Sequence, residues 1–179
     1  EPHSTLRGRY AFARLGASVP HQNMDLKLPA RDGVTLAATL FEPDEPNGAA
    51  LLINGGTGIP RQYYGGFAQH LAMRGFIVLT YDYREIDFPS MLDHLARLAP
   101  GAALGMVGHS FGGQVLGLAD NIAMVRAAVL VATQTGHWRH WPAGRRRLRM
   151  LALWWFMIPG LTALTGRFPG SWVGTADLP

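Results

Sequence analysis

Four short apolar runs constrain the fold of this chain more than any other feature of its sequence. An unbroken apolar run of this length is typical of a strand buried on both faces, as in a parallel sheet covered by helices. The stretches between the runs contain helical spacing, most clearly in 86–98 and, more briefly, in the small-residue segment GGQVLGLADN (112–121). The sequence therefore predicts repeated strand–helix–strand units in a three-layer α/β fold. The four runs are AALLIN (49–54), FIVLTYDY (76–83), ALGMV (103–107) and AAVLVAT (127–133).

A β-hairpin is expected ahead of these units. The segment MDLKLPA (24–30) alternates apolar and polar residues, breaks at RDG, and is followed by a returning strand, TLAATLFEP (35–43). We expect three parts: an N-terminal arm over 1–23, an α/β core over 24–133 and a cap over 134–179. The hydrophobic content of 48% and the charged content of 16% favour a folded core over a disordered chain.

The sequence contains no cysteine, which excludes disulfides and thiolate metal sites. The first 20 residues lack a continuous apolar segment of the kind found in secretory signals. We therefore expect a cytoplasmic protein.

Charge is distributed unevenly along the chain. Residues 1–120 carry a net charge of −2, whereas residues 121–176 contain seven arginines and no acidic residue, and all five tryptophans lie after residue 136. The arginines are not interleaved with a nucleic-acid-binding motif, so nucleic acid is not the expected partner. The apolar stretch Met150–Ile158 follows the basic RRRLR. We expect it to cover a pocket or pack on the core, and contact with an anionic membrane surface is the alternative.

Pro159 and Gly160 separate the apolar stretch Met150–Ile158 from the apolar residues Leu161–Leu164. Even when the two segments are joined, their length is expected to fall short of the ~20 residues that a membrane span needs.

The segment VGHSFGGQ (107–114) contains the spacing of a serine nucleophile. Ser110 lies between Gly108 and Gly112, after a predicted buried strand and before a predicted helix. In such a strand–turn–helix elbow the serine is forced towards positive φ, and its neighbours two residues away must be glycine-sized. We expect Ser110 to be a catalytic nucleophile; a glycine loop that merely turns the chain is the alternative.

A second glycine-rich loop, NGGTG (54–58), lies upstream of the serine at the end of a predicted buried strand. Backbone N–H groups in such a loop can approach a substrate oxygen that becomes negative in the transition state. We expect the N–H of Gly56, with Thr57 as the alternative, to form an oxyanion hole together with the N–H of Phe111. Nucleotide binding is not expected, because the loop lacks the G-K-[ST] and full G-x-G-x-x-G patterns.

These stretches resemble the α/β-hydrolase superfamily, and more closely a group of bacterial predicted α/β-hydrolases related to serine aminopeptidases and lipases. The segments that are similar to this group, which together cover most of 24–178, are INGGTGIPRQYY, GFIVLTYDYR, VGHSFGGQVLGLADN and TGHWRHWP. The resemblance implies Ser110 as nucleophile, an oxyanion site at Gly56 and Phe111, and a cap built from 134–178. It implies hydrolysis of an ester, thioester or amide and no narrower substrate class. We expect a small-molecule acyl substrate, apolar in character, and no metal or organic cofactor.

The sequence departs from that group at two places. In relatives, YDYR continues into a loop of roughly twenty residues before the next helix, whereas here Glu85 follows Arg84 directly. We therefore expect a gap between Arg84 and Glu85. Relatives also continue past the cap into two more strands, which bring the triad acid and then the histidine.

The remaining acids and histidines do not complete a triad in that order. After Ser110 the only acids are Asp120 and Asp177, and no histidine follows Asp177. The triad acid and histidine are therefore expected outside these 179 residues. A pocket lined by His137, Trp138 and His140, with one histidine as base, is a further possibility. The alternative function is a non-catalytic protein of the same fold that binds an apolar ligand or a partner under its cap.

We expect structural roles for the other titratable groups near these motifs. His109 should pack in the core, because adjacent side chains point apart at such an elbow. Asp82 should be a structural hydrogen-bond acceptor.

Overall fold

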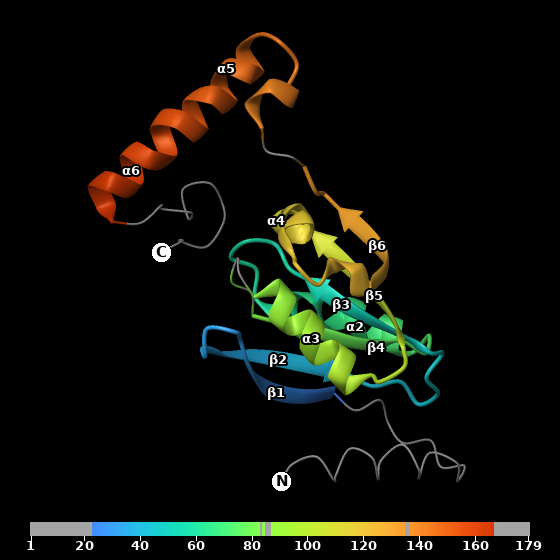
Figure 1. Cartoon of the computed structure of the whole chain (residues 1–179). Helices are drawn as coiled ribbons and strands as arrows, with labels where there is room; N and C mark the ends of the chain where they lie inside the picture. The colour runs from blue at the N-terminus through green and yellow to red at the C-terminus, as the bar shows by residue number, and fades with distance from the viewer. Residues whose placement is uncertain (1–22, 83, 85–86, 135–136, 167–179) are drawn as a thin grey trace.

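A six-stranded mixed sheet forms the centre of the computed structural model, which describes residues 23–82, 84, 87–134 and 137–166 (Figure 1). The strand order is β1-β2-β4-β3-β5-β6; β1 and β2 are antiparallel to their neighbours, and β4, β3, β5 and β6 run parallel. The strands are β1 Asn23–Pro29, β2 Thr35–Phe41, β3 Ala49–Asn54, β4 Ile77–Tyr81, β5 Ala103–His109 and β6 Val125–Val131.

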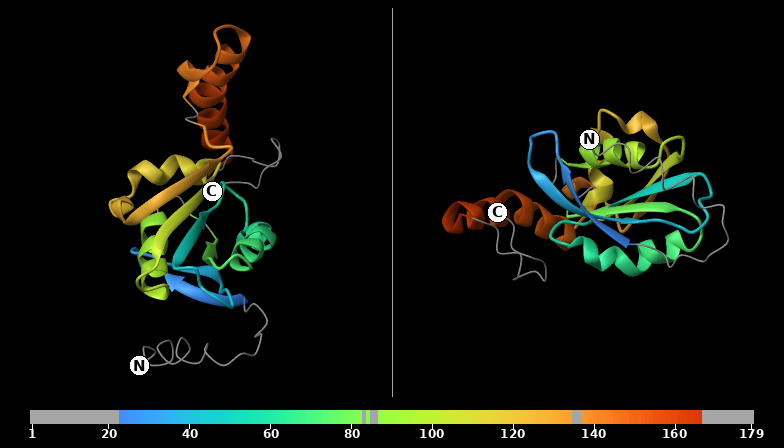
Figure 2. Two further views of the ribbon diagram at one scale, coloured as in Figure 1. Left: turned by 90° about the vertical axis from the view of Figure 1, so that its right-hand side faces the viewer. Right: turned by 90° about the horizontal axis from the view of Figure 1, so that it is seen from below.

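Helices cover the two faces of this sheet (Figure 2). The short 3₁₀ helix η1 (Arg61–Tyr64) leads into α2 (Gly65–Ala72) on one face, and α3 (Phe88–Leu98) packs on the other. The element α4 (Phe111–Gln114) continues as the 3₁₀ helix η2 (Val115–Leu118), and η3 (Ile122–Met124) leads into β6. The predicted three-layer α/β architecture is confirmed.

Alternation along the strands separates two hydrophobic cores. In β4 every residue is buried; Leu79 and Tyr81 face the core under α3, whereas Val78 faces the core under α2. In β3, Leu52 faces the core under α3 and Ile53 faces the core under α2. The apolar runs are unbroken because both faces of these strands are covered.

The strands begin and end close to the expected positions. The hairpin strands match within two residues, β6 begins two residues before the predicted run, and α3 begins two residues after the predicted position. The stretch after the serine differs more: the helix predicted over GGQVLGLADN is a short α-turn followed by a 3₁₀ turn, both finished by Leu118. Small residues and two adjacent glycines give this segment little intrinsic tendency to extend as an α-helix.

The expected gap between Arg84 and Glu85 falls on a junction outside the described residues, because Glu85 and Ile86 are not described. Arg84 and Asp87, which flank the residues that are not described, contact each other. The Arg84 side chain donates to the buried Asp87 carboxylate, and the Asp87 N–H donates to the Arg84 carbonyl at 3.2 Å. This is a short connection into α3.

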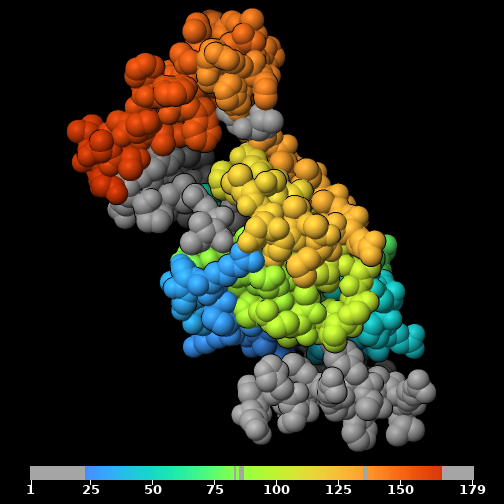
Figure 3. All heavy atoms as spheres, in the orientation of Figure 1, coloured from blue at the N-terminus to red at the C-terminus, as the bar shows by residue number. Residues whose placement is uncertain are grey.

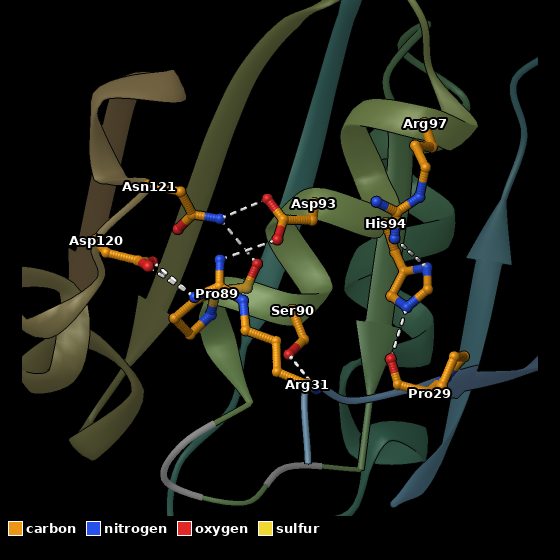
Figure 4. A network of polar contacts seen from close by, with 9 residues as sticks. All are labelled: Pro29, Arg31, Pro89, Ser90, Asp93, His94, Arg97, Asp120 and Asn121. Carbon is orange, nitrogen blue, oxygen red and sulfur yellow. Dashed lines mark hydrogen bonds and ion pairs between the residues drawn. The ribbon is translucent and has the colours of Figure 1, made fainter. Parts of the chain in front are cut away.

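A polar network pins the hairpin turn to the helical layer (Figure 4). The Arg31 guanidinium donates to Asp120 at 2.8 Å and to Asp93 of α3 at 3.0 Å, while its backbone N–H donates to the Ser90 hydroxyl. The Asn121 amide donates to Asp93 and to the Pro89 carbonyl. One arginine thus joins the β1–β2 turn, α3 and the loop before η3.

A long helix follows the sheet. It runs continuously from Arg145 to Thr165 as α5 (Arg145–Ala152), a π-helical turn η5 (Leu153–Met157) and α6 (Ile158–Thr165). The expectation that Pro159 interrupts it is wrong. In an α-helix the Pro159 ring would meet the carbonyl of Trp155. Trp155 lies in the widened π turn, which ends at Met157, two residues before the proline.

None of the residues in this helix is buried, and Figure 1 shows the helix (orange to red) projecting away from the sheet. The expected packing on the core is therefore not seen in the described residues. The helix is long and apolar enough to cross a membrane by length and composition, which corrects the expectation from the interrupted stretch.

Candidate active site

The chain turns sharply at Ser110. Strand β5 ends at His109, α4 begins at Phe111, and Ser110 between them has φ 52° and ψ −119°. L-residues rarely adopt such angles, and they persist only where the surroundings enforce them. The Ser110 N–H donates to the Val131 carbonyl at 2.9 Å, which ties the turn to the end of β6. The predicted positive φ is confirmed.

The glycines around Ser110 allow the backbones to approach each other. A Cβ on Gly112 would collide with the carbonyl oxygens of Asn54 and Gly55, and one on Gly108 would lie 2.6 Å from the Gly113 Cα. A Cβ on Gly113 would collide with the Thr133 hydroxyl. Strand, loop and helix meet here at distances that leave no room for a side chain.

The glycine-rich loop after β3 lies beside the serine. A Cβ placed on Gly56 would be 3.4 Å from the Ser110 Cβ and 3.1 Å from His109 Nδ1. The two motifs are separated by about fifty residues of sequence, and the parallel pairing of β3 with β5, which places Asn54 opposite Gly108, brings them together.

The Gly56 N–H, expected to bind an oxyanion, donates instead to the Tyr64 hydroxyl at 2.9 Å. Both groups are buried, and a buried N–H group requires an acceptor. Gly56 and Thr57 are the two candidate oxyanion donors in this loop. Thr57 is half-buried, and its N–H does not donate to Tyr64.

Tyr64 connects the loop to the elbow and was not expected from the sequence. Its hydroxyl lies 2.9 Å from His109 Nδ1, and the two rings meet edge to face at 5.9 Å. An arrangement that satisfies all three groups has Tyr64 accepting from Gly56 and donating to a His109 ring protonated on Nε2. Burial raises the pKa of Tyr64, so the hydroxyl keeps its proton near neutral pH. The only sequence signal was an aromatic pair, Tyr63–Tyr64, shortly after the loop.

Polar contacts, buried at Asn54 and half-buried at Asp82, hold the ends of the strands. The Asn54 amide donates to the Gly112 carbonyl at 2.6 Å, and its oxygen accepts from the Tyr81 hydroxyl. Asp82, which follows β4, accepts from the backbone and the guanidinium of Arg61 at 2.9 and 2.5 Å. The structural role expected for Asp82 is therefore what the structure shows, whereas His109, expected in the core, is half-buried and contacts the Tyr64 hydroxyl instead.

Within the described residues no histidine or carboxylate is hydrogen-bonded to the Ser110 hydroxyl. Asp120 is engaged with Arg31. His137, Trp138 and His140 form a cluster in the 3₁₀ turn η4 (Trp138–His140), with ring centroids 5.4–6.1 Å apart. Figure 1 shows this turn (orange) beside α5, at the far end of the linker that follows β6. Asp177 lies outside the described residues.

Comparisons with known proteins bear on the fold. No family model matches the chain, and no curated protein matches it. Solved structures do. A hypothetical protein from Pseudomonas aeruginosa aligns with 87% of this chain at a TM-score of 0.59 and 20% identity. An α/β serine hydrolase without lid from Xanthomonas campestris aligns with 71% at a TM-score of 0.55 and 16% identity.

An esterase domain from a Rhodothermus marinus protein aligns with 66% of the chain at a TM-score of 0.54 and 26% identity. The fold is therefore the α/β-hydrolase fold. The chain spans 59% of the length of the Pseudomonas protein, 67% of the Xanthomonas hydrolase and 57% of the Rhodothermus esterase domain.

Proposed function

We propose that this protein is a serine hydrolase in which Ser110 attacks the carbonyl of an ester, thioester or amide. The observation that carries the proposal is the Ser110 backbone, whose φ of 52° places the serine on a strained turn between β5 and α4. Strain of this kind costs of order 1–3 kcal/mol and clusters at active sites. A turn that only reversed the chain direction would be met by glycine at no such cost.

The chemistry follows from the groups beside the serine. The Ser110 hydroxyl, half-exposed at the turn, attacks the carbonyl carbon, and the carbonyl oxygen becomes negative. The backbone N–H groups of Phe111 and Thr57 are the proposed donors to that oxygen. Tyr64 supports the second donor indirectly, because it fixes Gly56 and hence the loop that presents Thr57.

The proton on Ser110 requires a base, and the described residues do not place one against it. We propose that the histidine and its carboxylate lie outside the 179 residues. Loss of the base from a serine triad costs on the order of 10⁶-fold in turnover. A small, apolar acyl compound is the proposed substrate class; the esterase comparison supports a small-molecule substrate, and the apolar character is part of the proposal.

The test is covalent labelling of Ser110 with a fluorophosphonate probe. The complete gene product should label, Ser110→Ala should abolish the labelling, and Ser4→Ala, a serine change outside the elbow, should leave it unchanged. Residues 1–179 expressed alone should label at a rate near background. Rapid labelling of 1–179 would contradict the placement of the base, and His137 and His140 would be the first residues to substitute. A complete gene product that does not label would favour the non-catalytic binding protein.

A further inference from the structure

The helix Arg145–Thr165 is exposed, although its composition is that of a buried or membrane-embedded helix. Trp155 and Phe156 are 65% and 70% exposed, and no residue of the helix is buried. From Met150 to Ile158 every residue is apolar, so the helix has no polar face in this region. A helix that is apolar all round is stable only inside a protein core or a membrane.

Its charge is concentrated at one end. Four arginines lie in the first five positions, and no acidic residue occurs between 121 and 176. The four are Arg145, Arg146, Arg147 and Arg149. Residues 1–120, which include the sheet up to β5, have the opposite balance, with a net charge of −2. An anionic surface would therefore attract this end of the molecule and repel the sheet.

The turn before the helix adds groups that are suited to a membrane interface. The Arg139 guanidinium lies over the Trp138 ring at 5.2 Å from its centroid, and the Arg147 side chain donates to the Trp141 carbonyl at 3.0 Å. Tryptophan is enriched at the level of lipid headgroups, and arginine is enriched in cytoplasmic segments that flank membrane helices. In Figure 3 this turn (orange) and the helix (orange to red) project from one end of the body formed by the sheet and its helices.

We propose that the helix Arg145–Thr165 docks the protein on a bilayer that contains anionic lipid. The arginines bind lipid phosphates, and the apolar turns from Met150 onward enter the hydrocarbon region. At 1.5 Å per residue, Trp155 lies about 9 Å deeper than Arg149 along the helix axis. Pro159 and Gly160 are compatible with this environment, since both occur more often in membrane helices than in soluble ones.

Vesicle flotation of the purified protein tests the proposal. The protein should float with vesicles of phosphatidylcholine and 30% phosphatidylglycerol, and far less with phosphatidylcholine alone. Juxtamembrane arginines contribute about a fivefold factor each in partitioning, so Arg145→Gln/Arg146→Gln should weaken binding to the anionic vesicles about 10–30-fold. The control, Arg74→Gln/Arg126→Gln, removes the same charge from exposed positions elsewhere and should bind like the wild type. Equal flotation with both vesicle types would overturn the role of the arginines.

Two further variants test the apolar part. Trp155→Asp/Phe156→Asp should abolish flotation while the melting temperature of the sheet domain stays the same, because neither side chain is part of its core. Lipids brominated in the acyl chains should quench tryptophan emission in the wild type, and Trp154→Phe/Trp155→Phe should float normally with most of that quenching lost.

Other occupants of the helix would give different results. If the helix closes over the sheet instead, the protein will not float, and its tryptophan emission will be blue-shifted without vesicles. If it pairs with a second copy, a concentration-dependent dimer will form and will not float. Either result would overturn the proposal.

Discussion

At the scale of single residues, the site depends on glycines, because a side chain at these positions would keep the backbone segments apart. Gly112 lies where the carbonyls of Asn54 and Gly55 face the start of α4, and this contact brings the loop after β3 against the elbow. The position is restrictive because the atoms facing it belong to backbone, which cannot rotate away as a side chain can.

Gly112→Ala should therefore destabilise the fold by at least about 2–3 kcal/mol, as overpacking against rigid atoms does. Gly117→Ala is the matched control, because a Cβ there would meet nothing within 4 Å. This control should be neutral or up to about 1 kcal/mol more stable, through the smaller entropy of its unfolded chain. Urea denaturation of both variants provides the measurement. A Gly112→Ala protein as stable as the control would show that the loop and the elbow do not pack as described.

At the scale of elements, one arginine outside the hydrophobic cores connects three segments. Hydrogen bonds from Arg31 lower the pKa of Asp120 below its ordinary value, and Arg84 does the same for Asp32 at the hairpin turn. A carboxylate whose pKa is lowered on folding contributes stability above its unfolded pKa of about 4 and loses that contribution as the pH falls through the folded value.

Arg31→Gln should lower the urea midpoint slightly at pH 7, because these groups are exposed and their ion pairs are screened by water. The difference from the wild type should shrink as the pH falls below about 4, because Asp120 then becomes protonated, first in the unfolded chain and at lower pH in the folded protein. Arg74→Gln, an exposed charge change outside the network, should show no such convergence. A difference that stays constant with pH would mean that the Arg31 ion pairs do not contribute to stability.

Local constraint explains which elements could be predicted from the sequence. The strands β3, β4 and β5 are mostly apolar over consecutive residues, and the Ser110 turn follows from glycines at fixed spacing, so both were expected correctly. Tyr64 could not be assigned, because its contacts with Gly56 and His109 depend on how η1 is placed over the sheet. The continuous helix Arg145–Thr165 was missed because proline usually ends a helix, and the π turn that accommodates Pro159 has no simple sequence signal.

At the scale of the whole molecule, the sheet is unequally covered from one edge to the other. Strand β4 is buried throughout, whereas six of the seven residues in β6 are exposed, including Val129 and Leu130 at 59% and 50%. An edge strand with uncovered faces has few contacts to hold it closed.

Hydrogen exchange measured by mass spectrometry should report this gradient in protection. Amides of Ala127–Val131 should exchange at least about 100-fold faster than those of Val78–Tyr81, because opening β6 exposes little additional apolar surface. Strand β3, buried on both sides of the sheet, serves as the internal control and should exchange as slowly as β4. Equal protection of β6 and β4 would show that another part of the molecule covers the edge.

The projection of a cationic helix from an acidic body also makes the molecule an electric dipole. Before any contact with a negatively charged surface, the field of that surface would rotate the molecule, so that it arrives with the arginine end first. Rotation of this kind raises the rate of productive encounters rather than the lifetime of the complex. It weakens as salt shortens the reach of the field to about 10 Å at 0.1 M ionic strength. The placement of Arg145–Arg149 on an arm away from the sheet thus determines which end of the molecule approaches the surface first.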